Sequence, residues 1–340
     1  MDKRTKKLIR RLIFITLSGA IIGCIVGFVR GLELGGLQGI EFGISKGILI
    51  GSSISLFTSV FGLAIYPQAL KRFSFTAEIL IKTITYTLIV ITLFILVSYL
   101  FTPVISFKVQ VEMLVPVIII TIGATLVSTF MMSIDRLLGR RILLNFFTGK
   151  YHHPVEEERI FMFADLVSST TIAEKIGHIE FHKFLNDFFF DITFPVIESN
   201  GEIYKYVGDE LIAVWHVKDA DTNYRCMNCY FEMKEEIEKQ KNKYLKSYGF
   251  TPTFRVGMHC GTVITGEMGD YKREIAFLGD VVNTTARIQE ESKAHKQDVL
   301  ISGKLMSKIN FPKEVNTESM GIVKLRGKET ELELFAVRKI

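Results

Sequence analysis

Four apolar stretches dominate the first 134 residues of this chain, at residues 12–30, 47–66, 77–100 and 111–134. Each is long enough to cross a hydrocarbon core of about 30 Å as an α-helix. The first stretch could instead be a signal peptide, but its apolar run is longer than such a peptide needs and no small-residue cleavage site follows it. The sequence therefore predicts an α-helical membrane domain of four transmembrane helices over residues 1–134.

Basic residues flank these stretches unevenly. The first eleven residues contain Lys3, Arg4, Lys6, Lys7, Arg10 and Arg11. Lys71, Arg72, Arg136, Arg140 and Arg141 follow the second and fourth stretches, whereas the other flanks hold only Arg30, Lys46 and Lys108. Because basic flanks face the cytoplasm, we expect a multi-pass protein of the inner (plasma) membrane whose two ends are both cytoplasmic. The net charge of +5 thus points to a membrane surface rather than to nucleic acid.

Few charged residues interrupt the apolar half. Glu33, Glu41 and Lys46 lie in a Gly-rich stretch between the first two apolar runs, where they could line a ligand site or an ion path. A wetted extracytoplasmic loop explains them more simply. Lys82 lies near the cytoplasmic end of the third run, where its head group could reach the interface.

Residues 135–158 are predicted to form a connector. DRLLGRRILLNFF can continue the fourth helix, and Gly149 and Pro154 then break it. His152 and His153 have no third metal ligand nearby and are interpreted as linker residues.

The four cysteines are too few and too scattered for a disulfide framework, which favours a reduced, cytosolic setting. Cys226 and Cys229 form a C-x-x-C pair, but no second pair completes a zinc site. We expect both to lie on a buried helix.

From Arg159 onward the pattern changes to short strands and amphipathic helices. Strands are predicted at 159–166, 201–215 (two strands around Gly208), 254–269 and 323–337 (a pair), and helices at 170–177, 181–199, 222–245 and 281–293. The order β-α-β-β-α-β is that of a ferredoxin-like α+β domain, here over residues 159–340.

Two aspartates lie at the ends of predicted strands. Asp165 closes the first strand, and Asp209 follows Gly208 in a hairpin turn. Each has an ordinary explanation as a turn residue. Carboxylates at the rim of a sheet are also held rigidly, as a site for Mg²⁺ or Mn²⁺ bound to phosphates requires.

Three separated segments, FADLVSSTTIAEKIG, KYVGDE and FLGDVVNTTARI, together resemble the catalytic domain of class III adenylate cyclases over residues 159–338. The resemblance implies that Asp165 and Asp209 hold two divalent cations, Mg²⁺ or Mn²⁺. It implies that Lys205 selects adenine, that Asn283 orients the ribose and that Arg287 stabilises charge on the α-phosphate. The apolar half carries no resemblance that we can name.

Other positions of the resemblance are less complete. Ala276 falls where family members usually carry Asp or Thr, and it cannot bond the adenine amino group. Arg326 replaces a phosphate-binding lysine and keeps its charge. The backbone N–H groups of Ser169 and Thr170 could donate hydrogen bonds to phosphate oxygens. Thr171 and Glu174 have the spacing of a capping box. Asp280 is expected to begin a helix.

The family places its active site between two catalytic domains, and this chain has one domain with both sets of residues. The resemblance thus implies a homodimer that binds ATP and forms cyclic AMP, with lipid as a further partner and no nucleic acid. A guanylate cyclase and a catalytically silent membrane receptor remain alternatives. A transporter is disfavoured because polar residues are sparse in the apolar stretches, and the connector could pass a movement from the membrane half to the dimer interface.

Overall fold

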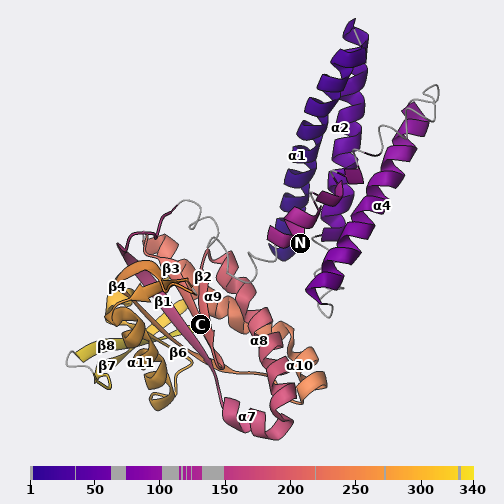
Figure 1. The fold of residues 1–340 in the computed structure, drawn as a ribbon. Helices are drawn as coiled ribbons and strands as arrows, with labels where there is room; N and C mark the ends of the chain where they lie inside the picture. The colour runs from indigo at the N-terminus through magenta and orange to yellow at the C-terminus, as the bar shows by residue number, and fades with distance from the viewer. Residues whose placement is uncertain are drawn as a thin grey trace. The chain divides into compact units, whose positions relative to one another are not determined.

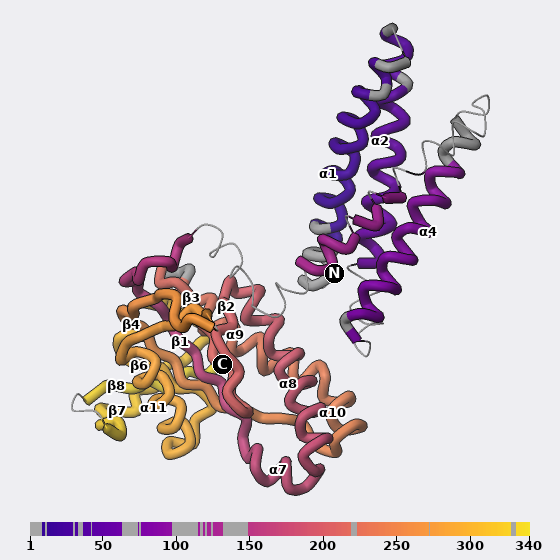
Figure 2. Tube along the Cα trace, in the orientation of Figure 1, coloured from indigo at the N-terminus to yellow at the C-terminus, as the bar shows by residue number. Residues whose placement is uncertain are grey.

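The computed structural model describes residues 3–34, 36–62, 74–101, 115, 118–119, 121–123, 125–131, 149–218, 220–271, 273–327 and 331–340. The chain divides into two compact units, Met1–Ile134 and Asp135–Ile340. Figures 1 and 2 show helices alone in the first unit and a sheet with helices in the second. Each unit is described by itself.

Among the described residues of the first unit, three helices are long and apolar enough to cross a membrane. They are α1 (Lys3–Leu34), α2 (Gly36–Val60) and α4 (Phe75–Phe101), with candidate spans at Leu12–Val29, Leu37–Val60 and Thr76–Leu96. Of the fourth predicted span, the described part is a shorter apolar helix, Thr121–Met131. Four transmembrane helices therefore remain a prediction, and connector residues 135–148 lie outside the described residues.

The expected loop between the first two spans is wrong. Glu33 lies in α1, and Glu41 and Lys46 lie in α2, which begins at Gly36. Lys82 of α4 is buried and forms an ion pair with Glu78, one turn nearer the start of the helix; its reach toward a membrane interface stays a prediction.

Glycines explain why this stretch is helical. Gly19, Gly23, Gly27 and Gly31 of α1 face Gly51, Gly47, Gly43 and Gly39 of α2 in antiparallel order. A spacing of four places each set on one helix face, and a Cβ built at Gly23 or Gly47 would overlap the backbone of the opposite helix. The glycines therefore permit close contact between two helix backbones, as small residues do in membrane bundles.

We expect Gly47→Leu to destabilise this helix pair by about 1 to 3 kcal/mol, because its side chain has no space and must push the helices apart. Thermal unfolding of the full chain in detergent, followed by far-UV circular dichroism, measures the loss. Ser45→Leu is the control, since it adds the same side chain at an exposed position of α2. Equal melting temperatures for the two variants would contradict the proposed packing.

The second unit is built on an eight-stranded sheet with the order β2-β3-β1-β4-β6-β8-β7, in which β5 pairs with β4 outside that path. The strands are β1 (Val155–Leu166), β2 (Glu202–Val207), β3 (Glu210–His216), β4 (Phe254–Met268), β5 (Glu274–Leu278), β6 (Val299–Ser302), β7 (Val315–Lys324) and β8 (Glu331–Lys339). The helices are α7 (Ser169–Ile176), α8 (His178–Glu198), α9 (Ala220–Lys239), α10 (Lys241–Tyr248), α11 (Asp280–Ala294) and α12 (Gly303–Met306).

Strand β1 lies at the centre of this sheet, antiparallel to both β3 and β4. Its even-numbered residues, such as Ile160 and Met162, pack in a large cluster with residues of α8, α9 and α10. Its odd-numbered residues, such as Phe161 and Phe163, pack in a smaller cluster with α11. Because successive side chains alternate between faces, Asp165 is directed to the side of α11.

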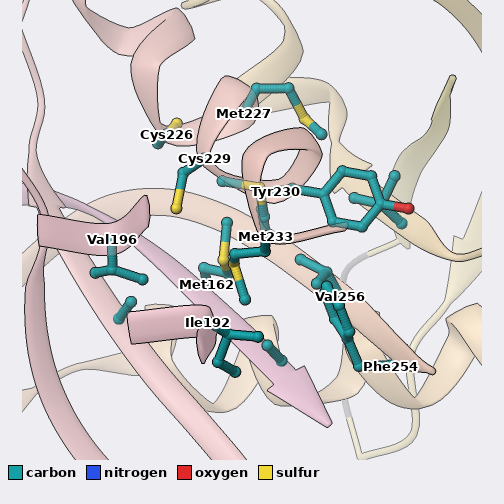
Figure 3. Packing of buried hydrophobic residues seen from close by; sticks show 14 of the residues in the cluster. Met162, Ile192, Val196, Cys226, Met227, Cys229, Tyr230, Met233, Phe254 and Val256 are labelled. Atoms are coloured by element: carbon teal, nitrogen blue, oxygen red, sulfur yellow. The ribbon is translucent and has the colours of Figure 1, made fainter. Parts of the chain in front are cut away.

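Cys226 and Cys229 lie in the larger cluster, as expected for residues of a buried helix. Figure 3 shows Cys229 and Met233 of α9 over Met162 of β1. Burial raises the pKa of both thiols, so they stay protonated and inert. Throughout the described residues, no group of three or more His, Cys, Asp or Glu is arranged to hold a metal ion.

Several boundaries differ from the sequence-based prediction. The helix expected at 222–245 is divided at Gln240 into α9 and α10. Strand β6 has four residues, which is too short for a recognisable alternation. Strand β1 begins at Val155, inside the expected connector, because its acidic first residues pair with β4 at the exposed end of the sheet.

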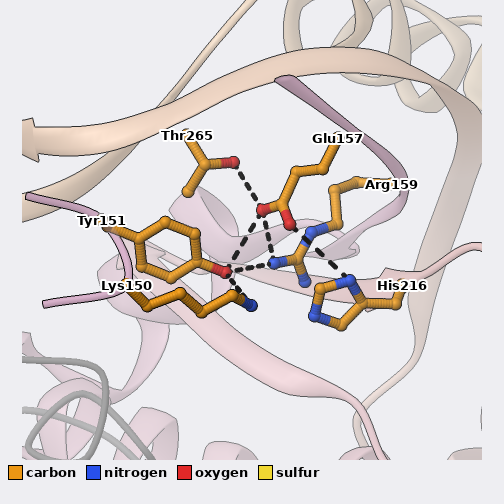
Figure 4. Close-up of polar contacts among 6 residues, drawn as sticks. All are labelled: Lys150, Tyr151, Glu157, Arg159, His216 and Thr265. Carbon is orange, nitrogen blue, oxygen red and sulfur yellow. Dashed lines mark hydrogen bonds and ion pairs between the residues drawn. The ribbon is translucent and has the colours of Figure 1, made fainter. Parts of the chain in front are cut away.

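A buried arginine ties the start of this unit to the sheet (Figure 4). Arg159 is 1% exposed, and its Nη2 donates to Glu157 Oε1 at 2.6 Å and to the Tyr151 hydroxyl at 2.8 Å. Burial raises the pKa of Glu157, but hydrogen bonds from Thr265 and Arg159 outweigh it and leave this pKa lowered. Burial and the charge of Arg159 lower the pKa of His216 to about 4, so its imidazole is neutral. The cluster therefore contains one ion pair, between Arg159 and Glu157, while the buried Nε and Nη1 of Arg159 have no hydrogen-bond partner among the described residues.

Candidate active site

Asp165 and Asp209 are brought together by the pairing of β1 with β3. Asp165 lies opposite Glu210 in the register of the two strands. Val207 pairs with Glu210, so Gly208 and Asp209 form the two-residue turn between β2 and β3. Gly208 has a φ of 63°, the left-handed conformation that such a turn requires at its first position. The turn therefore holds Asp209 beside the end of β1.

Negative charge accumulates at this end of the sheet. Burial, the charge of Asp209 and a hydrogen bond to its carboxyl raise the pKa of Asp165 to about 6. Burial and the charges of Asp165, Asp209 and Glu290 raise the pKa of Glu210 to about 7. Within the described part of the chain, no positively charged group is among those that shift the pKa of Asp165 or of Glu210.

Glu210 and Gln289 belong to this site but were not predicted from the sequence. Gln289 of α11 donates from Nε2 to Asp165 Oδ2 at 3.3 Å. Glu210 faces the same side of the sheet as Asp165, since directly opposed residues share a face. Only the register of β1 with β3, which places Glu210 opposite Asp165, identifies Glu210 as part of this site.

This carboxylate site suits a hard divalent cation. Its side chains offer oxygen donors, which Mg²⁺ and Mn²⁺ prefer, and their mutual repulsion would be relieved by a bound cation. The site offers two aspartates instead of a complete protein cage. Mg²⁺ characteristically binds through one or two carboxylates and takes its other ligands from phosphates and water.

The loop after β1 opens α7. Helix α7 begins at Ser169, and Ser168 before it adopts a left-handed φ of 61° without capping the helix through its side chain. The expected capping box of Thr171 and Glu174 is therefore wrong, because Thr171 already lies inside the first turn. The first-turn N–H groups, including those of Ser169 and Thr170, have no acceptor within the helix.

Lys205 lies on β2 with its ammonium near β5. Its Nζ donates to Glu274 Oε1 at 3.0 Å, and this hydrogen bond raises the pKa of Lys205. Ala276, two residues beyond Glu274 on β5, is 7% exposed. Glu274 had not been singled out from the sequence, because only the folded chain brings residues 205 and 274 together.

Asn283 and Arg287 share one face of α11. Asn283 is exposed, and Arg287 Nη1 donates to Glu290 Oε1 at 2.6 Å. Asp280 begins α11 as predicted, and its Oδ2 accepts from Thr284 Oγ1 at 3.1 Å. At about 100° per residue, Asn283 and Arg287 lie roughly 120° and 160° around the helix from Gln289. One chain therefore directs Gln289 toward Asp165 and directs Arg287 elsewhere.

Arg326 follows the end of β7 in an exposed turn. Its neighbour Leu325 packs in the same buried cluster as Ile288 of α11. The structure therefore brings Asp165 and Asp209 together. Lys205, Asn283, Arg287 and Arg326 lie on β2, on α11 and in the turn after β7, and the hydrogen bonds that Lys205 and Arg287 make, to Glu274 and Glu290, do not join them to that pair.

Comparisons with known proteins agree on the second unit. Residues 152–338 match the family model described as the adenylate and guanylate cyclase catalytic domain. Adenylate cyclase 2 of Rhizobium meliloti is 35% identical over 208 residues, which are 61% of this chain and 57% of that protein. The receptor-type guanylate cyclase gcy-7 of Caenorhabditis elegans is 26% identical over 205 residues, or 57% of this chain and 17% of that protein.

Among solved structures, a bacterial light-regulated adenylyl cyclase matches with a TM-score of 0.55 and 18% identity, covering 64% of this chain and 63% of that one. This likeness confirms the expected fold of the second unit. The chain spans little more than half the length of its Rhizobium relative.

We expect Asp165→Asn to raise the melting temperature of the full chain when divalent cations are absent. Because folding raises the pKa of Asp165, its ionised form lowers stability at neutral pH, and the neutral amide removes that penalty. Added Mn²⁺ should stabilise the unsubstituted protein and have little effect on the variant. Differential scanning fluorimetry in detergent measures both.

The matched control is Asp270→Asn, at an exposed turn between β4 and β5. It should leave both melting temperatures unchanged. Destabilisation by Asp165→Asn without cations would contradict the interpretation of these carboxylates as an uncompensated site.

Proposed function

This chain belongs to the adenylate and guanylate cyclase family, and from that membership we infer that it converts ATP to 3′,5′-cyclic AMP and pyrophosphate. The observation that carries the proposal is the carboxylate pair Asp165 and Asp209 at the rim of the sheet, where burial and the neighbouring Asp209 raise the pKa of Asp165. In the reaction, the ribose 3′-oxygen bonds to the α-phosphorus of the same nucleotide. The bond to the β-phosphate oxygen breaks, and the 3′ proton is lost.

We assign Asp165 and Asp209 as the residues that would hold two divalent cations, Mg²⁺ or Mn²⁺. When bound, such cations acidify a hydroxyl and neutralise the charge of a triphosphate. Gln289, which bonds Asp165, would fix the orientation of that carboxylate. The N–H groups of Ser169 and Thr170 at the start of α7 would receive phosphate oxygens.

The remaining residues would bind the nucleotide and its developing charge. Lys205 would donate to adenine N1, which accepts, whereas guanine N1 carries a hydrogen. Asn283 would orient the ribose. Arg287 and Arg326, as permanently charged planar donors, would stabilise charge on the α-phosphate and on the leaving phosphates.

These two groups of residues would meet only in a homodimer. Asp165 and Asp209 of one chain would face Lys205, Asn283 and Arg287 of the other, giving two equivalent sites. The direction of Arg287, away from the side of α11 that carries Gln289, supports this arrangement. In the isolated chain Arg287 bonds Glu290, and this ion pair would have to open for Arg287 to reach a phosphate.

Two other functions use the same fold. A guanylate cyclase is left open by Ala276, which cannot contribute to base selection, and is disfavoured by Lys205. A receptor with a silent nucleotide-binding domain is disfavoured because the metal, ribose and arginine positions all carry residues suited to their tasks. An assay with ATP or GTP and Mg²⁺ or Mn²⁺, scored for cyclic product, separates the three.

We predict that mixing two inactive variants restores activity. Asp165→Ala and Arg287→Ala should each lower turnover of ATP by about 100-fold or more, since each removes stabilisation of the transition state. Random pairing makes about half of the dimers mixed, each with one intact site of two, so about a quarter of the original activity should return.

The control mixture combines Asp165→Ala with Asp209→Ala, whose substitutions lie in the same half-site. It should stay inactive, because every site then lacks a carboxylate. Failure of the first mixture to recover, with dimers present by light scattering, would refute the shared site.

We further propose that the first unit anchors the chain in the plasma membrane, with the N-terminus and the cyclase unit in the cytoplasm. Three apolar helices of spanning length support this proposal. A site that consumes ATP must also face the compartment that supplies it. The proposed orientation places Lys108 outside and His153 inside.

Cysteines introduced at these two positions test the orientation. Lys108→Cys should react with a membrane-impermeant maleimide added to intact cells, whereas His153→Cys should react only after lysis. His153 is exposed in the structure, so its protection before lysis would come from the membrane. The opposite labelling pattern would overturn the orientation.

A further inference from the structure

The base-binding half of the site contains a carboxylate where none was expected. Lys205 of β2 donates to Glu274 of β5 at 3.0 Å, across 69 residues of sequence. The two side chains are 38% and 42% exposed, so a ligand can still reach them. Such a surface ion pair contributes little stability, so a ligand can engage both groups at little cost to the fold.

The position of Glu274 relative to Ala276 is set by strand geometry. Residues two apart on a strand project from the same side, and β5 pairs with β4 without a bulge from Glu274 to Leu278. The side chain of Glu274 therefore lies on the side of β5 where Ala276 offers only a methyl group. A carboxylate two residues away, on a longer side chain, can reach a ligand that passes over Ala276.

Aromatic packing holds the two strands in place. The ring of Phe277, next to Ala276, packs edge to face on Phe161 of β1 and on Tyr204 of β2, with centroid distances of 5.4 and 4.9 Å. Tyr204 directly precedes Lys205. These contacts fix β5 against β2, so the Lys205–Glu274 pair rests on a rigid framework.

The pair matches one edge of adenine. Adenine presents an acceptor at N1 and a donor at its 6-amino group, and an ammonium beside a carboxylate offers the complementary donor and acceptor. A carboxylate has about four acceptor sites, so a bond from Lys205 leaves capacity for an amino group. With Lys205 at position 1 and Glu274 at position 6, guanine, which has a donor at N1 and an acceptor at position 6, would place each group of the pair against the wrong partner.

We propose that Glu274 accepts the hydrogen bond from the 6-amino group of adenine and, with Lys205 at N1, makes the site selective for ATP although residue 276 is alanine. The proposal rests on the proposed cyclase function and names the residue that determines its base specificity. In this arrangement, the task usually assigned to position 276 is carried out from position 274.

Nucleotide binding and turnover are measured separately to test this assignment. With Mn²⁺ present, 3′-deoxy-ATP and 3′-deoxy-GTP, which lack the attacking hydroxyl, compete against a fluorescent nucleotide on the full chain in detergent. Glu274→Ala should weaken 3′-deoxy-ATP by about 10-fold or more, since it removes a charged hydrogen-bond partner, and change 3′-deoxy-GTP by less than about threefold. The ATP-to-GTP ratio of kcat/KM should fall by a similar factor.

Two further variants sharpen the result. Asp270→Ala, which removes an exposed acidic side chain near β5, should leave the ratio unchanged. The double variant Glu274→Ala with Ala276→Asp returns a carboxylate to the same side of β5 and should recover much of the preference for 3′-deoxy-ATP.

The outcomes separate this proposal from the proposed function. Equal loss of both nucleotides in Glu274→Ala, or an unchanged ratio, would overturn the role of Glu274 even if the chain makes cyclic AMP. Absence of any cyclic product, together with adenine-selective binding that Glu274→Ala abolishes, would overturn the cyclase function and keep the base-recognition role.

Discussion

The burial of Asp165 beside Asp209 is the constraint on which the candidate site of the second unit depends. Burial and the neighbouring Asp209 carboxylate raise the pKa of Asp165 to about 6, so the ionised form of Asp165 is unfavourable in the fold at neutral pH. The surrounding sheet opposes this cost. Strand β1 is buried on both faces from Arg159 to Ala164, and its seven-residue register with β3 fixes where the Gly208 turn falls. A bound cation would relieve the repulsion between the two carboxylates, and that relief would add to the affinity for the cation. Without a cation, the site therefore lowers the stability of the fold, as functional sites often do.

Local patterns place Asp165 and Asp209 at element boundaries, and the resemblance to class III cyclases identified them as a pair. Asp165 ends an apolar run and Asp209 follows a turn glycine, so each position is fixed by its neighbours. Glu274 and Gln289 could not be identified in the same way, since their partners Lys205 and Asp165 are 69 and 124 residues away. Strand β6 was not predicted, because its four residues are too few to show an alternation of apolar and polar side chains. Contacts that depend on tertiary pairing leave no local signal.

The incorrect prediction of a loop between the first two apolar stretches has a different cause. Glycine favours loops in soluble proteins, and Glu41 and Lys46 strengthened that interpretation. The glycines of α1 and α2, however, recur every four residues, which aligns them on one helix face. In a membrane domain small residues mark helix contacts, so their spacing is more informative than their number. The same type of residue thus closes the Gly208 turn in one unit and brings two helix backbones together in the other.

Charge balance distinguishes the two halves of the proposed site. Asp165 and Asp209 have like charges, no cationic side chain is among the groups that shift the pKa of Asp165, and the pair therefore favours a multivalent cation with the phosphates it carries. Glu274 has a carboxylate of the same chemistry, but Lys205 neutralises it. A neutral pair of donor and acceptor attracts neither metal nor phosphate, and instead complements a neutral base. The partner of each carboxylate, more than the carboxylate itself, thus decides which part of a nucleotide it can bind.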